Sequence, residues 1–338
     1  MSIKKKVAIG MSGGVDSSVA AYLLKEQGFD VIGLTMEIWD GSLQLPESAK
    51  DACYSANEKE DTEAVRSICE DLDIPFFPID LKKEYNENIL HYFKSEYLAG
   101  RTPNPCVRCN HRIKFGFLLD KSRSLGIEFD YFATGHYAQL KKQPDGRVVL
   151  KKAVDLSKDQ TYFIHALDKQ LLPQLLFPLG EKKKEEVRDI ARKIGLTVAE
   201  KSESQDFISG DYSELFKDEH IEPGDIVTET GEVLGSHKGI INYTIGQRRG
   251  LGISYTEPLY VTKIDANNNR VIVGTNEKLF SEGCIANNIS LSAIDSISEG
   301  MKVKARIRQQ HTEAPATLFP LENDCVKVLF DDMQLSVT

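Results

Sequence analysis

The sequence predicts an α/β protein that begins with a doubly wound parallel sheet and continues through a small helical domain into a C-terminal β-barrel. Up to about residue 140, short apolar runs alternate with helical stripes of apolar residues. This is the pattern of parallel strands joined by helices. A loop rich in glycine and serine directly follows the first apolar run. From about residue 224, short β-rich runs alternate with turn residues, which is typical of a small barrel or sandwich.

The first half divides into strands and helices in regular order. We expect strands at Val7–Gly10, Val31–Met36, Phe76–Ile79 and Tyr131–Thr134. The helices expected beside them are Val19–Gln27, Glu60–Leu72, Glu84–Leu98 and Lys114–Leu125. Ligands of such sheets bind at the carboxyl ends of the strands, and the loop after the first strand lies at such an end.

The second half changes character twice. From about residue 158 to 220 the pattern is mainly helical, with one charged and one apolar face over Lys182–Ile194. The β-rich runs that follow are Ile226–Thr228, Leu259–Ile264, Arg270–Val273, Val303–Ile307 and Val326–Phe330. We therefore predict domains at 1–150, 151–222 and 223–338.

Composition limits the class of protein. The chain has 338 residues, of which 41% are hydrophobic and 28% charged, as in soluble globular proteins. No apolar run approaches the roughly 20 residues of a membrane helix, and the first residues lead into a strand without a signal-peptide pattern. We expect a cytoplasmic protein without a membrane partner.

Cysteine content and charge bear on chemistry and partners. Six cysteines are too few for a disulfide scaffold, so Cys106-x-x-Cys109 is more typical of a reactive or metal-binding pair. A net charge of −9 argues against wholesale wrapping by nucleic acid. A local basic strand over 302–308 would still suffice to contact RNA.

The loop Ser12–Ser18 has the composition of a phosphate-binding site. Gly13 and Gly14 allow the backbone to approach a phosphate closely, and the free N–H groups of the following helix favour an anion. Serine hydroxyls add donors. Asp16 places a carboxylate where phosphate and Mg²⁺ would lie, so a bridging metal ion is the natural way to balance its charge.

The loop is not a Walker loop, because it contains no lysine. Its sequence Ser-Gly-Gly-Val-Asp-Ser-Ser resembles the pyrophosphatase loop of enzymes that split ATP into AMP and pyrophosphate. That superfamily includes synthetases for GMP, NAD, asparagine and argininosuccinate, and several tRNA-thiolating enzymes.

Four further segments resemble the tRNA-specific 2-thiouridylase family, in its order and at about its spacing. They are Gly100–Phe115, Ala133–Ala138, Lys158–Phe163 and Tyr243–Gly252. The resemblance implies an ATP-pyrophosphatase domain of the adenine nucleotide alpha hydrolase type, a central helical tRNA-binding domain and a β-barrel. It implies adenylation of O2 of the wobble uridine, U34, with Mg²⁺ and ATP, after which sulfur displaces AMP to give 2-thiouridine. The implied partners are tRNA with a wobble uridine and a sulfur-donor protein or other persulfide source.

The resemblance also assigns residues by position. Those that would hold ATP are Gly10, Met11, Ser12, Gly13, Gly14, Val15, Asp16, Ser17, Met36 and Gly135. Those that would touch tRNA are Asn104, Pro105 and Cys106 at the target base, and His136, Lys158, Asp159, Gln160, Arg306 and Ile307. Cys109 matches the first catalytic cysteine, and we expect Asp16 and Cys106 to take part in catalysis with it.

The chain departs from the family at the second catalytic cysteine, which normally carries a persulfide. The aligned position holds Ile208, or Phe207 if the loop is one residue shorter. Three replacements are open: Cys109 takes the persulfide and Cys106 resolves it; Cys53 substitutes in space; or Cys106, Cys109 and Cys53 hold an iron–sulfur cluster. A zinc site at Cys106-x-x-Cys109 would need two more ligands.

A second departure is at the end of the barrel. The family normally continues with a Pro-Gly-Gln turn and further strands, whereas this sequence stops at Thr338. We therefore expect an incomplete barrel, with Val326–Phe330 either at an exposed edge or paired by another element.

These departures leave a second class of function open, a catalytically reduced paralogue that binds ATP and tRNA without thiolating. A third interpretation, an amide synthetase acting on a small metabolite, leaves Pro103–Phe115 without a purpose. The leading prediction is a tRNA-uridine 2-sulfurtransferase.

Overall fold

A computed structural model describes residues 4–43, 52–200, 206–208 and 212–337. The chain forms two compact units. The first contains Met1–Ile89, Pro105–Asp211 and Ser290–Ala293, and the second contains Leu90–Asn104, Tyr212–Ile289 and Ile294–Thr338. The division into three domains predicted from the sequence stays a prediction.

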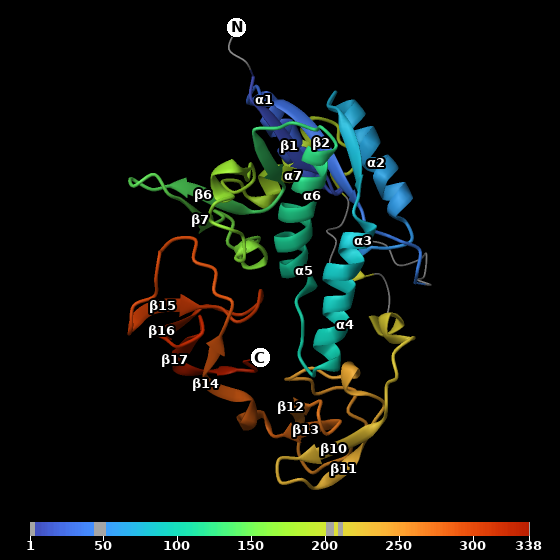
Figure 1. Ribbon diagram of the computed structural model, residues 1–338, viewed down its shortest axis with the longest axis vertical. Coiled ribbons are helices and arrows are strands. Elements are labelled where there is room, and N and C mark those ends of the chain that lie inside the picture. Colours follow the sequence, from blue (N-terminus) through green and yellow to red (C-terminus); the bar gives the residue numbers. More distant parts are fainter. Residues whose placement is uncertain (1–3, 44–51, 201–205, 209–211, 338) are drawn as a thin grey trace. The chain divides into compact units, whose positions relative to one another are not determined.

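The first unit is built on a five-stranded parallel sheet, ordered β4-β2-β1-β5-β8 (Figure 1). Its strands are β1 (Lys6–Gly10), β2 (Asp30–Glu37), β4 (Phe76–Asp80), β5 (Tyr131–Thr134) and β8 (Leu175–Leu176). The chain proceeds from β1 to one side through β2 and β4, and then returns to the other side at β5. This reversal makes the sheet doubly wound, as predicted, and places the ligand crevice at the carboxyl ends of β1 and β5.

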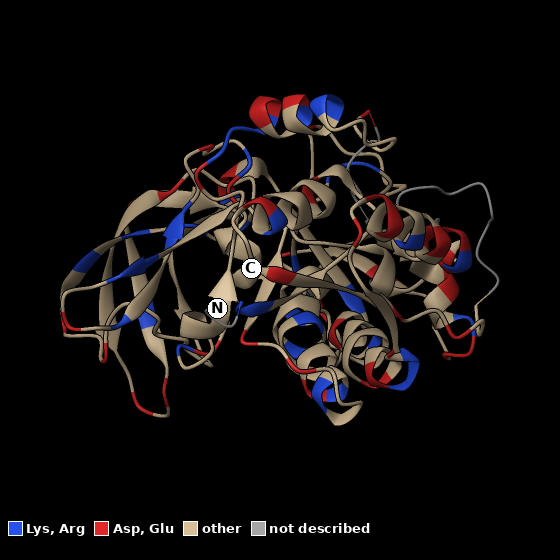
Figure 2. Ribbon diagram, turned by 90° about the horizontal axis from the view of Figure 1, so that it is seen from above, with Lys and Arg blue, Asp and Glu red and all other residues tan. Residues whose placement is uncertain are grey.

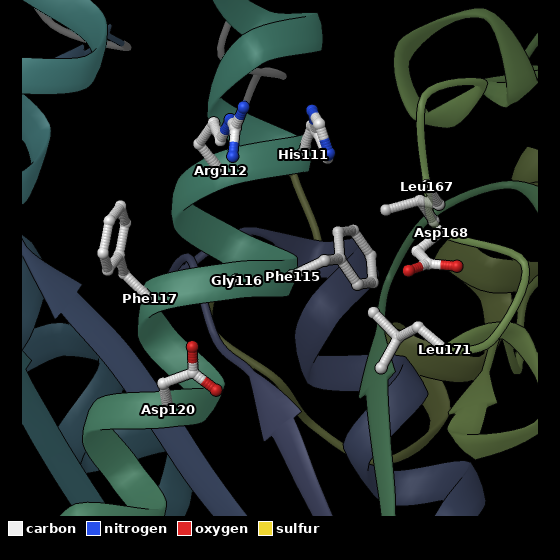
Figure 3. A pocket seen from close by; sticks show the side chains of 9 residues that line it. All are labelled: His111, Arg112, Phe115, Gly116, Phe117, Asp120, Leu167, Asp168 and Leu171. Carbon is white, nitrogen blue, oxygen red and sulfur yellow. The ribbon is translucent and has the colours of Figure 1, made fainter. Parts of the chain in front are cut away.

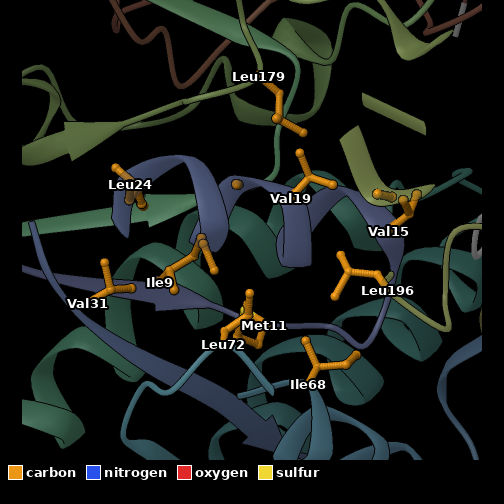
Figure 4. Packing of buried hydrophobic residues seen from close by; sticks show 14 of the residues in the cluster. Ile9, Met11, Val15, Val19, Leu24, Val31, Ile68, Leu72, Leu179 and Leu196 are labelled. Carbon is orange, nitrogen blue, oxygen red and sulfur yellow. The ribbon is translucent and has the colours of Figure 1, made fainter. Parts of the chain in front are cut away.

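Helices α1 (Val15–Glu26), α2 (Glu58–Asp71) and α7 (Lys184–Lys193) share the main core of this unit. Figure 4 shows Ile9 of β1, Val19 of α1 and Ile68 of α2 in that cluster. Each is at most 3% exposed, and Val187 of α7 is fully buried with them. Apolar residues at helical spacing produce this packing, because they place one stripe of each helix against the sheet.

Two predicted helices are longer than expected. The first is continuous through α3 (Lys82–Tyr85), the π-helical segment η1 (Asn86–Leu90) and α4 (His91–Leu98). The second begins nine residues early, as α5 (Pro105–Arg108), and continues through the π-helical segment η2 (Cys109–Phe117) into α6 (Leu118–Ser124). A proline is favoured at the first position of a helix, because its missing N–H would have no partner there.

The stretch from 158 to 220 is less helical than predicted. Besides α7 it contains the short 3₁₀ segments η3 (Thr161–Ile164), η4 (Leu172–Gln174) and η5 (Tyr212–Phe216). The antiparallel hairpin of β6 (Ala138–Lys142) and β7 (Val148–Lys152) precedes it. The apolar residues in this stretch pack from turns instead of from long helices, which a periodicity search cannot distinguish over so few residues.

One strand pair in the first unit was not predicted. β3 (Ala52–Tyr54) lies parallel to β9 (Asp206–Ile208), with Tyr54 opposite Ile208. The two segments are short and more than 150 residues apart in the sequence. Neither has the alternation of a half-buried strand that would have revealed it.

The second unit contains two four-stranded sheets. The first, ordered β11-β10-β13-β12, is formed by β10 (Gly224–Thr228), β11 (Val233–His237), β12 (Tyr260–Asp265) and β13 (Arg270–Gly274). The second, ordered β14-β17-β16-β15, is formed by β14 (Phe280–Ala286), β15 (Met301–Ala305), β16 (Ala314–Pro320) and β17 (Val326–Leu335). Short 3₁₀ segments, η6 (Ile240–Asn242) and η7 (Asn276–Leu279), complete it.

Of the two outcomes expected for Val326–Phe330, the exposed edge is wrong and pairing by another element is confirmed. β17 is an inner strand, paired with β14 on one side and β16 on the other. It also continues five residues beyond Phe330. β15 begins and ends two residues earlier than predicted, so Arg306 and Ile307 follow the strand instead of ending it.

Acidic and basic residues are interspersed along the ribbon (Figure 2). In the part of the chain that the structure describes, no helix has the length and apolarity that a membrane span requires.

Candidate nucleotide and sulfur-transfer site

The loop after β1 has the geometry of an anion site. Gly13 adopts a positive φ of 69°, a conformation that side chains disfavour. Gly14 is the N-cap residue of α1 and contributes no side-chain cap. The first N–H groups of α1 therefore remain for a ligand, with the positive end of the helix dipole behind them.

Serine side chains fix the shape of this loop. The hydroxyl of Ser17 donates to the Gly14 carbonyl at 3.1 Å and accepts from the Ser12 N–H at 3.2 Å. The Ser18 hydroxyl donates to the same carbonyl at 2.9 Å. At the base of the loop, the Met11 N–H donates to the Leu34 carbonyl at 2.7 Å, which ties it to β2.

Gly135 follows β5 and allows the two loops to meet. A Cβ at this position would lie 2.8 Å from the carbonyl carbon of Asp16 and 2.8 Å from the nitrogen of Ser17. Only a glycine permits this approach. The predicted ATP residues Gly10–Ser17 and Gly135 are thus brought together where the strand order reverses, while Met36 lies in β2 opposite Ile79.

Asp16 is held by two residues that sequence analysis did not identify. Nζ of Lys184 donates to both carboxylate oxygens at 2.8 Å, and the Tyr137 hydroxyl donates to Oδ1 at 2.9 Å. The ammonium also lies 5.7 Å from the centre of the Tyr137 ring. Tyr137 lies within the Ala133–Ala138 motif, whereas Lys184 lies in a run of three lysines in which no pattern indicates a functional role.

The segment Lys158–Gln160, which is expected to touch tRNA, holds the backbone of Tyr137 in place. Gln160 exchanges two hydrogen bonds with the Tyr137 backbone, each 2.9 Å long. Asp159 is 2% exposed; its carboxylate accepts from the Ala153 N–H at 3.0 Å and from the Thr161 hydroxyl at 2.6 Å. Lys158 is partly exposed at the end of the same segment.

His136 is enclosed by aromatic rings. Its centroid lies 5.9 Å from that of Phe115 and 6.2 Å from that of Phe177, and Nδ1 is 2.7 Å from the Thr134 hydroxyl oxygen. Burial, and secondarily the charge of Lys114, hold the pKa of His136 well below its usual range. The imidazole is therefore neutral at physiological pH.

The two cysteines of the Cys106-x-x-Cys109 motif lie on a helix, one in α5 and one at the start of η2. Burial raises the pKa of the Cys109 thiol to about 12. Lys114 acts in the opposite direction, while neighbouring Cys53 and Cys106 add to the increase. Cys109 is consequently a thiol at neutral pH.

Cys53 belongs to the same neighbourhood. Burial raises the pKa of the fully enclosed Tyr85 hydroxyl, and the thiols of Cys109, Cys53 and Cys106 each add to that effect. Cys53 is exposed, whereas Cys106 and Cys109 are half-buried. The fold therefore brings Cys53 into the same neighbourhood as the Cys106-x-x-Cys109 motif.

The strand pair β3–β9 explains how Cys53 arrives there. Its register places Cys53 opposite Phe207, next to the position where the family pattern has its second cysteine. Ile208 is 5% exposed and lies opposite Tyr54. Tyr54 stacks on Tyr85 with ring centroids 5.4 Å apart.

The described side chains offer no ready-made site for a single metal ion. Among the described residues, no group of three or more His, Cys, Asp or Glu side chains is arranged to hold a metal ion. Asp16, the expected magnesium ligand, already accepts three hydrogen bonds from Lys184 and Tyr137.

A cavity of about 350 Å³ lies beside η2 (Figure 3). The first of its lining residues is His111, which follows Cys109 by two positions in the sequence. Its lining residues are His111, Arg112, Phe115, Gly116, Phe117, Asp120, Leu167, Asp168 and Leu171. No cysteine lines this cavity, so it neighbours the thiols without containing them. The remaining predicted tRNA residues, Asn104, Arg306 and Ile307, belong to the second unit.

Comparison with known proteins is consistent with this architecture. The family profile described as tRNA methyl transferase HUP domain matches residues 5–209, and that described as tRNA methyl transferase PRC-barrel domain matches residues 215–275. The tRNA-specific 2-thiouridylase MnmA of Endomicrobium trichonymphae is 46% identical over 100% of this chain and 94% of its own length. MnmA 2 of Thermoanaerobacter sp. strain X514 is 48% identical over 100% of this chain and 93% of its own length. With such similarity over its whole length, the chain belongs to the tRNA-specific 2-thiouridylase family.

Proposed function

We propose that this protein is an ATP-dependent tRNA-uridine 2-sulfurtransferase that converts the wobble uridine U34 to 2-thiouridine. The proposal rests on the nucleotide-binding loop after β1, which lies where the strand order of the sheet reverses. It rests equally on the membership of the chain in this family. The cysteines around Tyr85 supply the sulfur chemistry that such a reaction needs.

In the first step, O2 of the uridine attacks the α-phosphorus of ATP and pyrophosphate leaves. This converts a poor leaving group into AMP. The α1 N-terminus and the loop 10–17 hold the phosphates. Because Asp16 is engaged by Lys184, we assign Mg²⁺ to the phosphates of ATP themselves, a common mode for this ion, and not to direct ligation by Asp16.

In the second step, sulfur attacks C2 and AMP leaves. We assign the persulfide to Cys53, because it is exposed to a sulfur donor and lies beside the strand whose Ile208 or Phe207 aligns with the family's second cysteine. Its terminal sulfur bonds to C2. Cys109 loses its proton to solvent and, as the thiolate, attacks Sγ of Cys53. The persulfide S–S bond breaks, and its electrons leave with the 2-thiouridine sulfur.

This step leaves a disulfide between Cys53 and Cys109, which a dithiol reductant returns to thiols. Cys106 remains the alternative resolving group. We route no step through an iron–sulfur cluster. For tRNA contacts we retain Asn104, Pro105, Cys106, His136, Lys158, Gln160, Arg306 and Ile307, and assign buried Asp159 to shaping its loop.

The test measures 2-thiouridine in unmodified tRNA after incubation with Mg²⁺, ATP, a persulfide donor and a dithiol. Nucleoside mass spectrometry should detect product from the unaltered protein and from Cys284→Ala, a control in the second unit, but none from Cys109→Ala or Cys53→Ala. Peptide mass spectrometry should place the persulfide on Cys53. Persulfide on Cys109 alone would transfer the carrier role to Cys109, with Cys106 resolving. Binding of ATP and tRNA without product from any variant would instead favour the catalytically reduced paralogue.

A further inference from the structure

We propose that Lys184 is the positioning residue of the nucleotide loop, supplying from α7 the cation that the loop's own sequence lacks. The inference rests on the proposed binding of ATP. It concerns a residue that has no place in the loop motif and stands 168 positions from its partner Asp16.

The contact is specific in geometry. Nζ of Lys184 lies 2.8 Å from both oxygens of the Asp16 carboxylate, so one ammonium satisfies the two acceptors together. The lysine side chain is 10% exposed and the aspartate side chain 26% exposed. Charged hydrogen bonds that are shielded from water in this way are stronger than those of a surface ion pair.

The surrounding elements hold the ammonium in place. The Lys184 N–H donates to Oδ2 of Asp155 at 3.0 Å, which fixes the first turn of α7. Tyr137 offers its ring face to the ammonium and its hydroxyl to Asp16. Helices α1 and α7 also contribute buried residues to the same hydrophobic core, among them Val19 of α1 and Val187 of α7. The pair is thus set by the packing of two helices, not by two flexible side chains.

The electrostatic need for this cation follows from the position of Asp16. A carboxylate in the first turn of α1 lies beside the N–H groups that would receive phosphates. Uncompensated, its charge would repel them. In a Walker loop a lysine within the loop approaches the phosphates. Here Lys184 balances Asp16 and keeps the net charge at the loop favourable for a polyanion.

The test compares affinities for ATP and for adenosine by calorimetry. Lys184→Met should weaken ATP binding by roughly tenfold or more, because it leaves a shielded carboxylate without its partner. The affinity for adenosine, which has no phosphates, should remain unchanged. Lys184→Arg should retain most of the affinity for ATP. Lys193→Met, at the exposed far end of α7, is the matched control and should behave as the unaltered protein.

The double variant Asp16→Asn, Lys184→Met separates charge from structure. Without the carboxylate, the missing cation matters less, so this variant should bind ATP several-fold more tightly than Lys184→Met. Equal loss of ATP and adenosine binding in Lys184→Met, or no recovery in the folded double variant, would overturn the inference. If Lys184→Met does not fold, Lys184→Arg and the double variant carry the comparison. Failure of the unaltered protein to bind ATP would instead contradict the proposed function.

Discussion

At the scale of single residues, the site combines groups that the sequence reveals with groups that only the fold reveals. Gly13, Asp16 and Cys109 were predictable, because a short local motif specifies each of them. Tyr137 and Lys184 were not predictable in their roles, because a tyrosine or lysine acquires a partner 121 or 168 residues away only through packing. Sequence patterns report local geometry and carry little information about such distant pairs.

The raised pKa of Cys109 gives a prediction about its reactivity. With a pKa of about 12, the group is protonated throughout the neutral range, and only the thiolate reacts with iodoacetamide. Alkylation of Cys109 should therefore accelerate roughly tenfold per pH unit between pH 7 and 9. Peptide mass spectrometry measures this rate, with Cys109→Ala as the blank. A rate that levels off near pH 7.5 would show a lowered pKa and contradict the prediction.

Gly135 offers a test of the contact between the two loops. In Gly135→Ala the new Cβ would lie 2.8 Å from backbone atoms of Asp16 and Ser17, so the loops must separate. We expect a loss of about 1–3 kcal/mol in the free energy of unfolding and a clear loss of ATP affinity.

Gly116→Ala is the matched control for this substitution. Its Cβ would approach nothing closer than the His111 carbonyl, at 3.4 Å, and alanine is favoured in a helix. Thermal unfolding and calorimetry measure both variants. Normal ATP affinity in Gly135→Ala would contradict the close approach.

At the scale of elements, the regular parts of the fold were predictable and the short pairs were not. Strands such as β1 and helices such as α2 have apolar patterns long enough to be recognised. β3 and β9 have three residues each, and their pairing depends on the whole unit being folded. The helical position of the cysteines was missed because the helix was expected to begin only at Lys114, whereas Pro105 in fact begins α5.

The register of β3 and β9 predicts where a cysteine can replace Cys53. Paired residues of neighbouring strands share a face, so Phe207 lies on the face of Cys53 while Ile208 lies on that of Tyr54. In a Cys53→Ala background, Phe207→Cys should therefore restore part of the 2-thiouridine formation. Ile208→Cys, on the opposite and buried face, is the matched control and should not. Rescue by Ile208→Cys alone would contradict the register argument.

β15 gives a prediction about tRNA binding. It is an edge strand on which Lys302 and Lys304 are exposed, while Val303 packs against the core of its sheet. If both lysines contact phosphates, Lys302→Gln with Lys304→Gln should reduce the slope of log affinity against log salt by roughly 1.4 to 1.8. Lys327→Gln, exposed on inner strand β17, is the control. An unchanged slope, measured by filter binding, would remove β15 from the tRNA surface.

At the scale of the whole molecule, the chain crosses between its two compact units more than once. Residues Leu90–Asn104, which include α4, belong to the second unit although they interrupt the first. Phe93 and Tyr97 of α4 pack on Tyr212 and Phe216, with the Tyr97 and Tyr212 rings stacked at 5.3 Å. This exchange is not evident from the sequence, because α4 continues a helix that begins in the first unit.

This exchange predicts how fragments behave. A fragment of residues 212–338 lacks the rings that cover Tyr212 and Phe216, and the loss of large buried aromatic side chains costs about 3–5 kcal/mol each. We expect it to bind a hydrophobic dye and to unfold without cooperativity. Addition of a peptide spanning 90–104 should restore a cooperative transition, whereas a peptide with Phe93→Ala and Tyr97→Ala should not. Cooperative unfolding of the fragment alone would show that α4 is dispensable.

The distance in sequence between Asp16 and Lys184 also has a consequence during synthesis of the chain. At 5–20 residues per second, a ribosome needs roughly 10 to 30 seconds to add the 168 residues that separate them. During that interval the nucleotide loop exists without its cation, and Cys53 exists without the strand that brings it to the other thiols. A chain that ends before Lys184 therefore lacks both the ion pair at Asp16 and the pairing of β3 with β9.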